Sequence, residues 1–282
     1  MQTSNEQAAA RPELPAVKLT QGIHVMHLFY RIDRVRWAEL GAAESASVRS
    51  KIQSLCEAHN SPSHPRITTY ANICGKADLA FILYAAELGQ IGQMHRDLER
   101  CFPAGTLQRV YQYLSITELT EYMPSDEDNR RMLIEQEKLN PESEEFKTRW
   151  AEMSKRKADY ERFRLYPEMP DWEVMAFYPM NKRRQGNDNW YTLDFATRKR
   201  LMGGHARVGR KYSGRVSQLI TGSIGLDDWE WGVTLMAHQT DALKEIVYEM
   251  RFDEVSARYG EFGPFYINLR LSPAALWAHL HL

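Results

Sequence analysis

One order of predicted strands and helices occurs twice along the chain, and this duplication constrains the fold more than any other feature. In the first half, β-branched and aromatic residues predict a strand at 22–32, and apolar residues at helical spacing predict a helix from Asp33 to His59 with Asp33 as its cap. A hairpin at 66–86, a helix at 88–101 and a strand at 109–119 follow. The order is βαββαβ.

The second half repeats this order without an obvious repeat of the sequence. It reads as a strand at 172–180, a helix at 194–205, a strand pair at 214–225 and 229–237, a helix from about 240 to 248 or beyond, and a strand at 262–271. Each half has the pattern of a ferredoxin-like split βαβ unit. We therefore predict an α+β fold of two ferredoxin-like βαββαβ repeats whose sheets form a β-barrel core, the dimeric α+β barrel type.

These repeats divide the chain into five segments: a flexible tail at 1–20, the first repeat at 21–122, a charged, partly helical connector at 123–171, the second repeat at 172–271 and a tail at 272–282. In the connector, Asn140 can cap a helix and Pro141 can occupy its first position. Apolar residues then recur at helical spacing as far as Tyr160. We expect a long, partly exposed helix, packed by a narrow apolar stripe or serving as a separate binding element.

Charge and cysteine content exclude several classes of protein. The net charge is -1, which gives no overall field to attract DNA or an anionic membrane, although local basic clusters could still bind anions. The three cysteines are widely spaced and form no C-x-x-C, which argues against a disulfide framework or a zinc site. The sequence shows neither a secretory signal nor a membrane span, so we expect a cytoplasmic protein.

His205 is the histidine with the most unusual surroundings. It stands at the end of a predicted helix, directly after Gly203 and Gly204. A histidine at a helix end is most often a capping or surface residue. The alternative is an axial ligand to a flat cofactor, because imidazole binds iron and glycine lets a planar ligand approach the backbone. His279 and His281 have the spacing of one strand face, but with no third ligand nearby in sequence they do not indicate a metal site.

Tyr178 and a group of cationic side chains are the other candidates. Tyr178 ends a strand immediately before Pro179, where an aromatic residue packs the core or rim, or where a phenol beside cations acts as a redox relay. The cations are solvated loop residues or donors for a substrate with several carboxylates, since arginine binds carboxylate in a bidentate fork. They are Lys182, Arg183, Arg184, Arg207, Arg210, Lys211 and Arg215.

Four motifs carry a family resemblance. They are "YPMNKRRQGNDNWYTL" from Tyr178, "H-x-x-x-G-R-x-Y-x-G-x-V" from His205, "QLITGSIGLDDWEWGVTL" and "YEMRFDEVSARYGEFGPFY". With them the chain resembles the chlorite dismutase-like superfamily, and most closely its coproheme decarboxylases. The resemblance implies that His205 is the axial iron ligand, that Tyr178 is the catalytic tyrosine that becomes a radical, and that Lys182 assists decarboxylation of the second propionate. It places the pocket and propionate contacts at Arg164, Met180, Arg210, Gln218, Arg251 and Ser256.

The resemblance also implies a reaction and partners. Iron coproporphyrin III (coproheme) would be the substrate and its own redox cofactor, hydrogen peroxide the oxidant and haem b the product. Relatives form homopentamers, and ferrochelatase is the expected transient partner. Gln218 stands where chlorite-degrading relatives carry arginine, which disfavours chlorite dismutase. The other alternative is a non-catalytic haem-binding or haem-delivery protein.

Two features depart from the family pattern. The connector is longer than in common relatives, so substrate access could differ. His205 is followed by Ala206 where many relatives have glycine, a change that we expect the site to tolerate.

Overall fold

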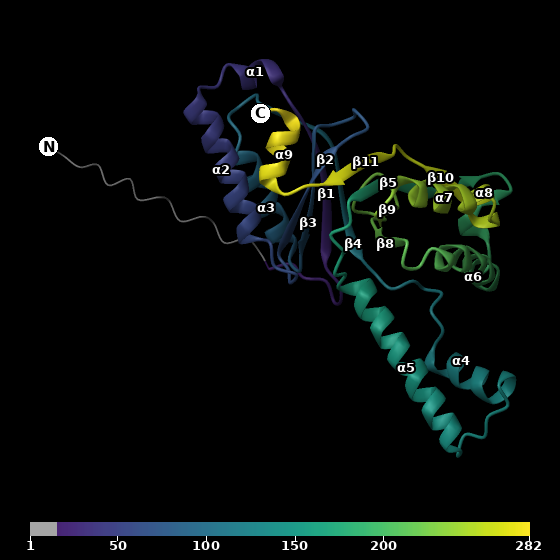
Figure 1. Ribbon diagram of the computed structural model, residues 1–282. Coiled ribbons are helices and arrows are strands. Elements are labelled where there is room, and N and C mark those ends of the chain that lie inside the picture. Colours follow the sequence, from purple (N-terminus) through teal and green to yellow (C-terminus); the bar gives the residue numbers. More distant parts are fainter. Residues whose placement is uncertain (1–15) are drawn as a thin grey trace.

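A computed structural model describes residues 16–282, so most of the tail predicted at 1–20 lies outside the described residues (Figure 1). The first repeat has the predicted order. Its strands and helices are β1 (His24–Ile32), α1 (Arg34–Ala38), α2 (Ala42–Ala58), β2 (Arg66–Asn72), β3 (Leu79–Ala85), α3 (Leu88–Arg100) and β4 (Leu107–Thr117).

The single helix predicted from Asp33 to His59 is wrong, because two helices occupy this segment. Asp33 does cap α1, and its side chain accepts hydrogen bonds from the backbone N–H groups of Val35 and Arg36 at 3.0 Å. The chain then leaves the helical conformation, and Gly41 adopts an extended conformation as the residue before α2. Apolar spacing alone did not show this interruption.

The second repeat follows the same plan with short additions. Its main elements are β5 (Val174–Lys182), α6 (Phe195–Lys211), β8 (Val216–Gly222), β9 (Trp231–Ala237), α7 (Thr240–Met250) and β11 (Tyr266–Arg270). The additions are a small hairpin of β6 (Arg184–Gln185) and β7 (Asp188–Asn189), a helical turn η2 (Trp190–Thr192), α8 (Glu254–Tyr259) and β10 (Gly260–Phe262). The strand predicted at 262–271 is split because Pro264, between β10 and β11, has no N–H to donate.

The helix expected to end at His205 continues to Lys211, so His205 lies inside α6 and the prediction of a helix-end histidine is wrong. Gly203 and Gly204 suggested a stop, but neither has a positive φ. Glycine lowers helix propensity without forcing a helix to end, and tertiary context overrides that preference here.

The eight main strands form one closed antiparallel sheet. In each repeat the strands have the ferredoxin-like order, β2-β3-β1-β4 in the first and β11-β5-β9-β8 in the second. Pairing of β4 with β8 and of β2 with β11 joins the repeats at both edges. The predicted fold is thereby confirmed, and every main strand has a strand partner on both sides, although β4 and β8 pair only through Ile116–Gly222 and Thr117–Thr221.

The interior of this closed sheet is filled by side chains of both repeats. His27 of β1 stacks on Phe177 of β5 at a ring distance of 4.2 Å. Its Nε2 lies 2.8 Å from the hydroxyl of Thr234 in β9. Burial lowers the pKa of His27 to about 3, so the ring is neutral at ordinary pH.

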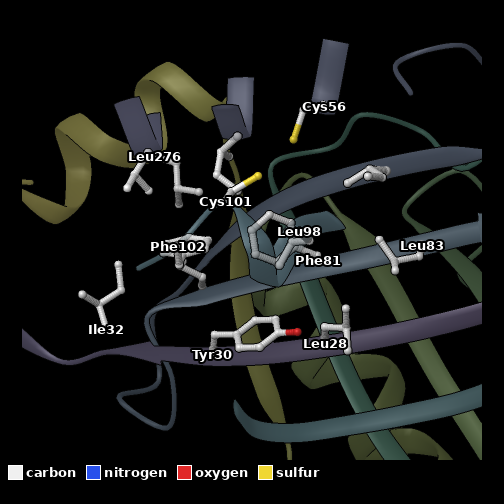
Figure 2. Close-up of a cluster of buried hydrophobic side chains, with 14 of the residues drawn as sticks. Leu28, Tyr30, Ile32, Cys56, Phe81, Leu83, Leu98, Cys101, Phe102 and Leu276 are labelled. Carbon is white, nitrogen blue, oxygen red and sulfur yellow. The ribbon is translucent and has the colours of Figure 1, made fainter. Parts of the chain in front are cut away.

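The outer face of the first repeat carries the largest apolar cluster, shown in Figure 2. Side chains of β1 and β3, including Leu28 and Phe81, pack there against α2, α3 and α9 (Pro273–Leu280). Helix α9 lies in the segment predicted as a tail, and Trp277 stacks on Trp37 at 5.4 Å. The strand spacing assigned to His279 and His281 is therefore wrong. Within residues 16–282, no three His, Cys, Asp or Glu side chains group as a metal site.

The connector contains α4 (Asp126–Arg131), a π-helical turn η1 (Met132–Gln136) and α5 (Glu144–Leu165). In Figure 1, α4 and the start of α5 extend away from the closed sheet. The predicted long helix is present, but its cap is Ser143, whose hydroxyl accepts from the N–H of Phe146. The prediction of Asn140 as the cap is wrong, since its side chain accepts from Glu142 in the preceding turn. In the described part of the chain, every helix is too short or too polar to span a membrane.

Candidate active site

A cavity of about 1790 Å³ lies against the outer face of the second repeat's sheet. Its walls are the outer faces of β5, β8 and β9, with α6, α7 and α8 opposite and α5 at the outer side. This volume exceeds the ~300–1,000 Å³ of ordinary small-molecule pockets. Most of the residues predicted for the site line this cavity: Arg164, Tyr178, Met180, Lys182, His205, Arg210, Gln218 and Ser256.

Strand β5 supplies three of these side chains through its alternation. Tyr178, Met180 and Lys182 are two residues apart, so they project from the same face of the strand into the cavity. Phe177, the residue directly before Tyr178, points instead into the interior of the closed sheet. The period of two explains why a phenol and an amine four residues apart reach one site.

The ring of His205 is oriented by a hydrogen bond to a carboxylate. Its Nδ1 lies 3.0 Å from Oδ2 of Asp253, and the Ser256 hydroxyl donates to the same oxygen. The other oxygen, Oδ1, accepts hydrogen bonds from the N–H groups of Val255 and Ser256. Burial would raise the pKa of Asp253, but these hydrogen bonds and His205 lower it overall, so the carboxylate is ionised. With Nδ1–H donating to Asp253, Nε2 is free to bind a metal.

Asp253 was not singled out from the sequence, although a signal was present. It stands before Glu254-Val255-Ser256, and an aspartate in that position is a typical helix N-cap. What the sequence could not show is that this cap would lie beside a histidine 48 positions earlier in the chain. Ser256, predicted as a pocket residue, contacts the same carboxylate.

Tyr178 is buried in an apolar, aromatic environment. The residue is 4% exposed, and its ring stacks on Phe265 at 4.3 Å. Burial raises the pKa of Tyr178 and the charge of Arg251 opposes this only in part, so the phenol keeps its proton. Arg251 lies at the end of α7 with its guanidinium 3.7 Å from the ring centre of Phe262, so it borders the cavity through that ring.

Lys182 is the buried cation of the site. Its Nζ lies 4.8 Å from the ring centre of Trp190. Burial lowers the pKa of Lys182 to about 8, against the opposing influence of the Asp253 and Glu230 carboxylates. At neutral pH the amine therefore carries most of a positive charge and can release its proton easily.

Gln218 of β8 contacts α6 at one end of the cavity. Its Nε2 donates to the backbone oxygen of Gly209 at 3.4 Å. A Cβ at Gly209 would lie 3.3 Å from Met250 and 3.4 Å from Gln218, so a side chain there would narrow this end of the cavity.

The predicted cationic cluster divides between the cavity and the surface. Lys182 and Arg210 line the cavity, whereas Lys211 and Arg215 pair with Glu249 and Glu245 on α7. Arg164, at the end of α5, donates to the backbone oxygens of Glu118 and Ile220, and its buried Nε has no partner among the described residues.

Comparison with known proteins agrees with this geometry. The sequence profile of the family described as chlorite dismutase matches residues 45–271, most of the chain. A solved structure described as a novel heme-binding protein from Thermus thermophilus is 38% identical, with 95% of this chain and 98% of that chain covered and a TM-score of 0.76. The chain belongs to the chlorite dismutase family.

More distant members share the fold. Chlorite dismutase from Candidatus Nitrospira defluvii in complex with imidazole is 16% identical, with 94% of this chain and 97% of that chain covered and a TM-score of 0.67. A mutant of the same enzyme is also 16% identical, with 94% and 98% covered and a TM-score of 0.68. The family includes haem-dependent enzymes, and this chain has the architecture that they use.

The residues present in the cavity fit an iron porphyrin. His205 offers Nε2, and its neighbours on the cavity side of α6, Gly203 and Ala206, are small. The opposite wall includes the apolar side chains of Val233 and Leu235. An imidazole with its other nitrogen hydrogen-bonded to a carboxylate is a suitable donor for haem iron.

Proposed function

We propose that this family member is a coproheme decarboxylase, which uses hydrogen peroxide to convert two propionates of iron coproporphyrin III to the vinyl groups of haem b. The observation that carries the proposal is one cavity into which β5 delivers Tyr178, Met180 and Lys182 while α6 delivers His205. A metal ligand, a buried phenol and a buried amine are the groups that this reaction requires.

Each group has a distinct task. His205 would hold the iron through Nε2, with Asp253 fixing its orientation. Lys182, Arg210 and Arg164 would supply positive charge for the propionates, and Gln218 a neutral amide. The bound iron porphyrin supplies, with peroxide, the oxidising equivalents.

Tyr178 would carry out the bond-breaking step. Its phenol loses one electron and one proton, and the resulting tyrosyl radical takes a hydrogen atom from the β-carbon of a propionate. Loss of carbon dioxide and a second electron leaves the vinyl group. Each propionate carboxylate, one hydrogen peroxide and one proton thus give one vinyl group, one carbon dioxide and two waters.

Lys182 would act on the second propionate, after the partly converted porphyrin has turned to bring it to Tyr178. A protonated amine near that carboxylate neutralises its charge inside a poorly solvated cavity. Because burial already lowers the pKa of Lys182 to about 8, the amine can also return a proton at little cost.

A haem-binding or haem-delivery protein without catalysis is the second candidate, favoured by the description of the Thermus thermophilus relative as a heme-binding protein. Chlorite dismutase is the third candidate, and it is disfavoured by Gln218, which stands where chlorite-degrading relatives carry arginine. We further propose that the protein forms a homopentamer in the cytoplasm and contacts ferrochelatase transiently. Measurement of the molecular mass of the protein in solution tests the pentamer.

The decisive experiment adds hydrogen peroxide stepwise to the protein loaded with iron coproporphyrin III and follows the porphyrin by mass spectrometry. Two successive losses of the mass of formic acid are expected. The Tyr178→Phe variant should bind the porphyrin, but the porphyrin should show neither mass loss. Tyr122→Phe, at another tyrosine that lines the cavity, should react normally. Bleaching without mass loss would favour the carrier, and oxygen release from chlorite would favour chlorite dismutase.

A further inference from the structure

The backbone ladder between β5 and β9 ends just before Lys182. Its last pair is Met180 with Trp231, so Asn181 and Lys182 have no backbone partner in β9, whereas on the other edge of β5 they pair with Glu261 and Gly260 of β10. Side chains continue the connection. The N–H of Lys182 donates to Oε2 of Glu230 at 2.7 Å, and the N–H of Glu230 donates to Oδ1 of Asn181 at 2.9 Å. We call this reciprocal pair the Glu230–Asn181 clamp.

The carboxylate of Glu230 is buried and depends on its hydrogen-bond and charge partners. The residue is 7% exposed, and a buried carboxylate is stable only with hydrogen bonds or a nearby positive charge. Its other oxygen lies 3.6 Å from the guanidinium of Arg184, in the small hairpin of β6 and β7. Burial and then this carboxylate raise the pKa of Tyr191, which lines the cavity. One side chain thus ties the end of β5 to the hairpin beside the cavity.

We propose that Glu230 is a positioning residue that holds Lys182 at the cavity wall and thereby controls the second decarboxylation. The proposal rests on the function proposed above. Glu230 acts through Lys182, whose amine needs a fixed direction to stay over Trp190 and reach a propionate.

The effect is confined to Lys182 because Tyr178 does not depend on the clamp. Tyr178 lies within the β5–β9 ladder opposite Val233, and its neighbour Phe177 pairs with Tyr266 of β11. Strands on both sides therefore fix the phenol. Asn181 and Lys182 have a strand partner on one side only, in β10, so loss of the clamp should loosen these two residues on the β9 side and leave the first decarboxylation unchanged.

A test without porphyrin measures how fast a lysine-specific reagent labels Lys182 in the free protein, with peptides quantified by mass spectrometry. Lys182 is 8% exposed and should react slowly. Glu230→Ala should raise its labelling rate about tenfold, as expected for loss of one hydrogen bond that closes the site. Glu230→Gln keeps an acceptor oxygen and should stay within about threefold of the unmodified chain.

Asn181→Ala removes the other half of the clamp and should give an intermediate labelling rate. Exposed Lys155 provides an internal reference in every sample. Unchanged labelling of Lys182 in both alanine variants would overturn the clamp. If Glu230→Ala does not fold, Asn181→Ala and Glu230→Gln still decide the question.

The functional test compares the rates of the two mass losses during peroxide addition. Glu230→Ala should slow the second loss about tenfold relative to the first, so that the singly decarboxylated porphyrin accumulates. Equal slowing of both steps would indicate a general structural role and overturn the positioning role, as would normal rates despite faster labelling. Absence of both losses in the unmodified protein would refute the proposed function, while the labelling result would still stand.

Discussion

The two repeats share one connectivity but use the outer faces of their sheets in opposite ways. In the first repeat, that face is packed with side chains, as Figure 2 shows, whereas in the second only part of it packs, against α7, and the rest faces the cavity. The second helix of each repeat does not explain this. Helix α3 buries Ile91, Met94 and Leu98, and α7 likewise buries three apolar residues, Ala242, Leu243 and Ile246.

The difference lies in the first long helix and in α9. Helix α2 buries Val48, Ile52 and Cys56, but α6, of the same length, buries Leu201 alone. Helix α9 adds further side chains to the first repeat, and among the described residues the second repeat has no equivalent. A fold of this type therefore makes a core or a cavity according to the side chains of its first long helix and to whether an added helix such as α9 covers the sheet.

Substitutions on these two helices should show the contrast directly. Ile52→Ala in α2 removes a fully buried side chain and should lower the free energy of unfolding by ~3 kcal/mol. Met202→Ala in α6 borders the cavity and should cost less than about 1 kcal/mol. Denaturant unfolding of the free protein measures both, and equal losses would contradict the assignment of α6 as a cavity wall.

A substitution in the cavity should affect porphyrin binding strongly and folding stability only slightly. His205→Ala should weaken binding of iron coproporphyrin III at least about 100-fold, or ~2.7 kcal/mol, because the proposed iron ligand is lost. The free protein should lose about 1 kcal/mol or less, since only the hydrogen bond to Asp253 disappears. Absorption titration measures the affinity, and His238→Ala on the surface is the control. Retained affinity would show that another residue binds the iron.

Acidification should lower the folding stability of the protein through His27, which lies in the interior of the closed sheet. The pKa of His27 is about 3 in the folded protein, below the ordinary 6.5, so the unfolded chain binds more protons between these values. Stability contributed by neutral His27 is complete above pH 6.5 and falls on acidification, by ~2 kcal/mol from pH 7 to pH 5. His27→Gln should flatten this part of the stability profile. His279→Gln, at an exposed histidine, should leave the dependence of stability on pH unchanged. If stability fell equally steeply with pH in both variants, the acid sensitivity would belong to other groups.

The smallest effect concerns the glycines of α6. A Cβ at Gly204 has no atom within 4 Å, so Gly204→Ala should raise the free energy of unfolding by ~0.5–1 kcal/mol and leave porphyrin binding unchanged. Gly209→Ala should gain similar helix stability but weaken porphyrin binding, because its Cβ meets Met250 and Gln218. Equal affinities in the two variants would show that the porphyrin does not approach Gly209.

The order of elements could be read from the sequence because period-two and helical patterns persist over whole strands and helices. Errors occurred where a local signal was weak or misleading. Apolar spacing did not mark the break before Gly41, and the start signal Ser272-Pro273 of the helix at 273–280 was overlooked. Gly203-Gly204 suggested a helix end, but the helix continues past them. In these places contacts between distant segments decide the outcome, and spacing within one segment cannot report them.

The candidate site was predictable to the extent that single residues carry chemistry. The alternation of β5 places Tyr178, Met180 and Lys182 on one face, as spacing alone allows. Asp253 and Glu230 escaped notice because their importance depends on neighbours far away in the sequence. Which arginines face the cavity also depended on the position of α5, which no local pattern fixes.

Helix α9 has a consequence for how the protein is made. Its residues complete the apolar cluster of the first repeat, yet they follow every strand of the second repeat in the chain. At typical synthesis rates, on the order of 10 s separates the emergence of β4 from that of α9. The newly made first repeat therefore spends this time with an uncovered apolar face. Ribosome-bound chains that end before α9 should accordingly bind chaperones that recognise exposed apolar surface.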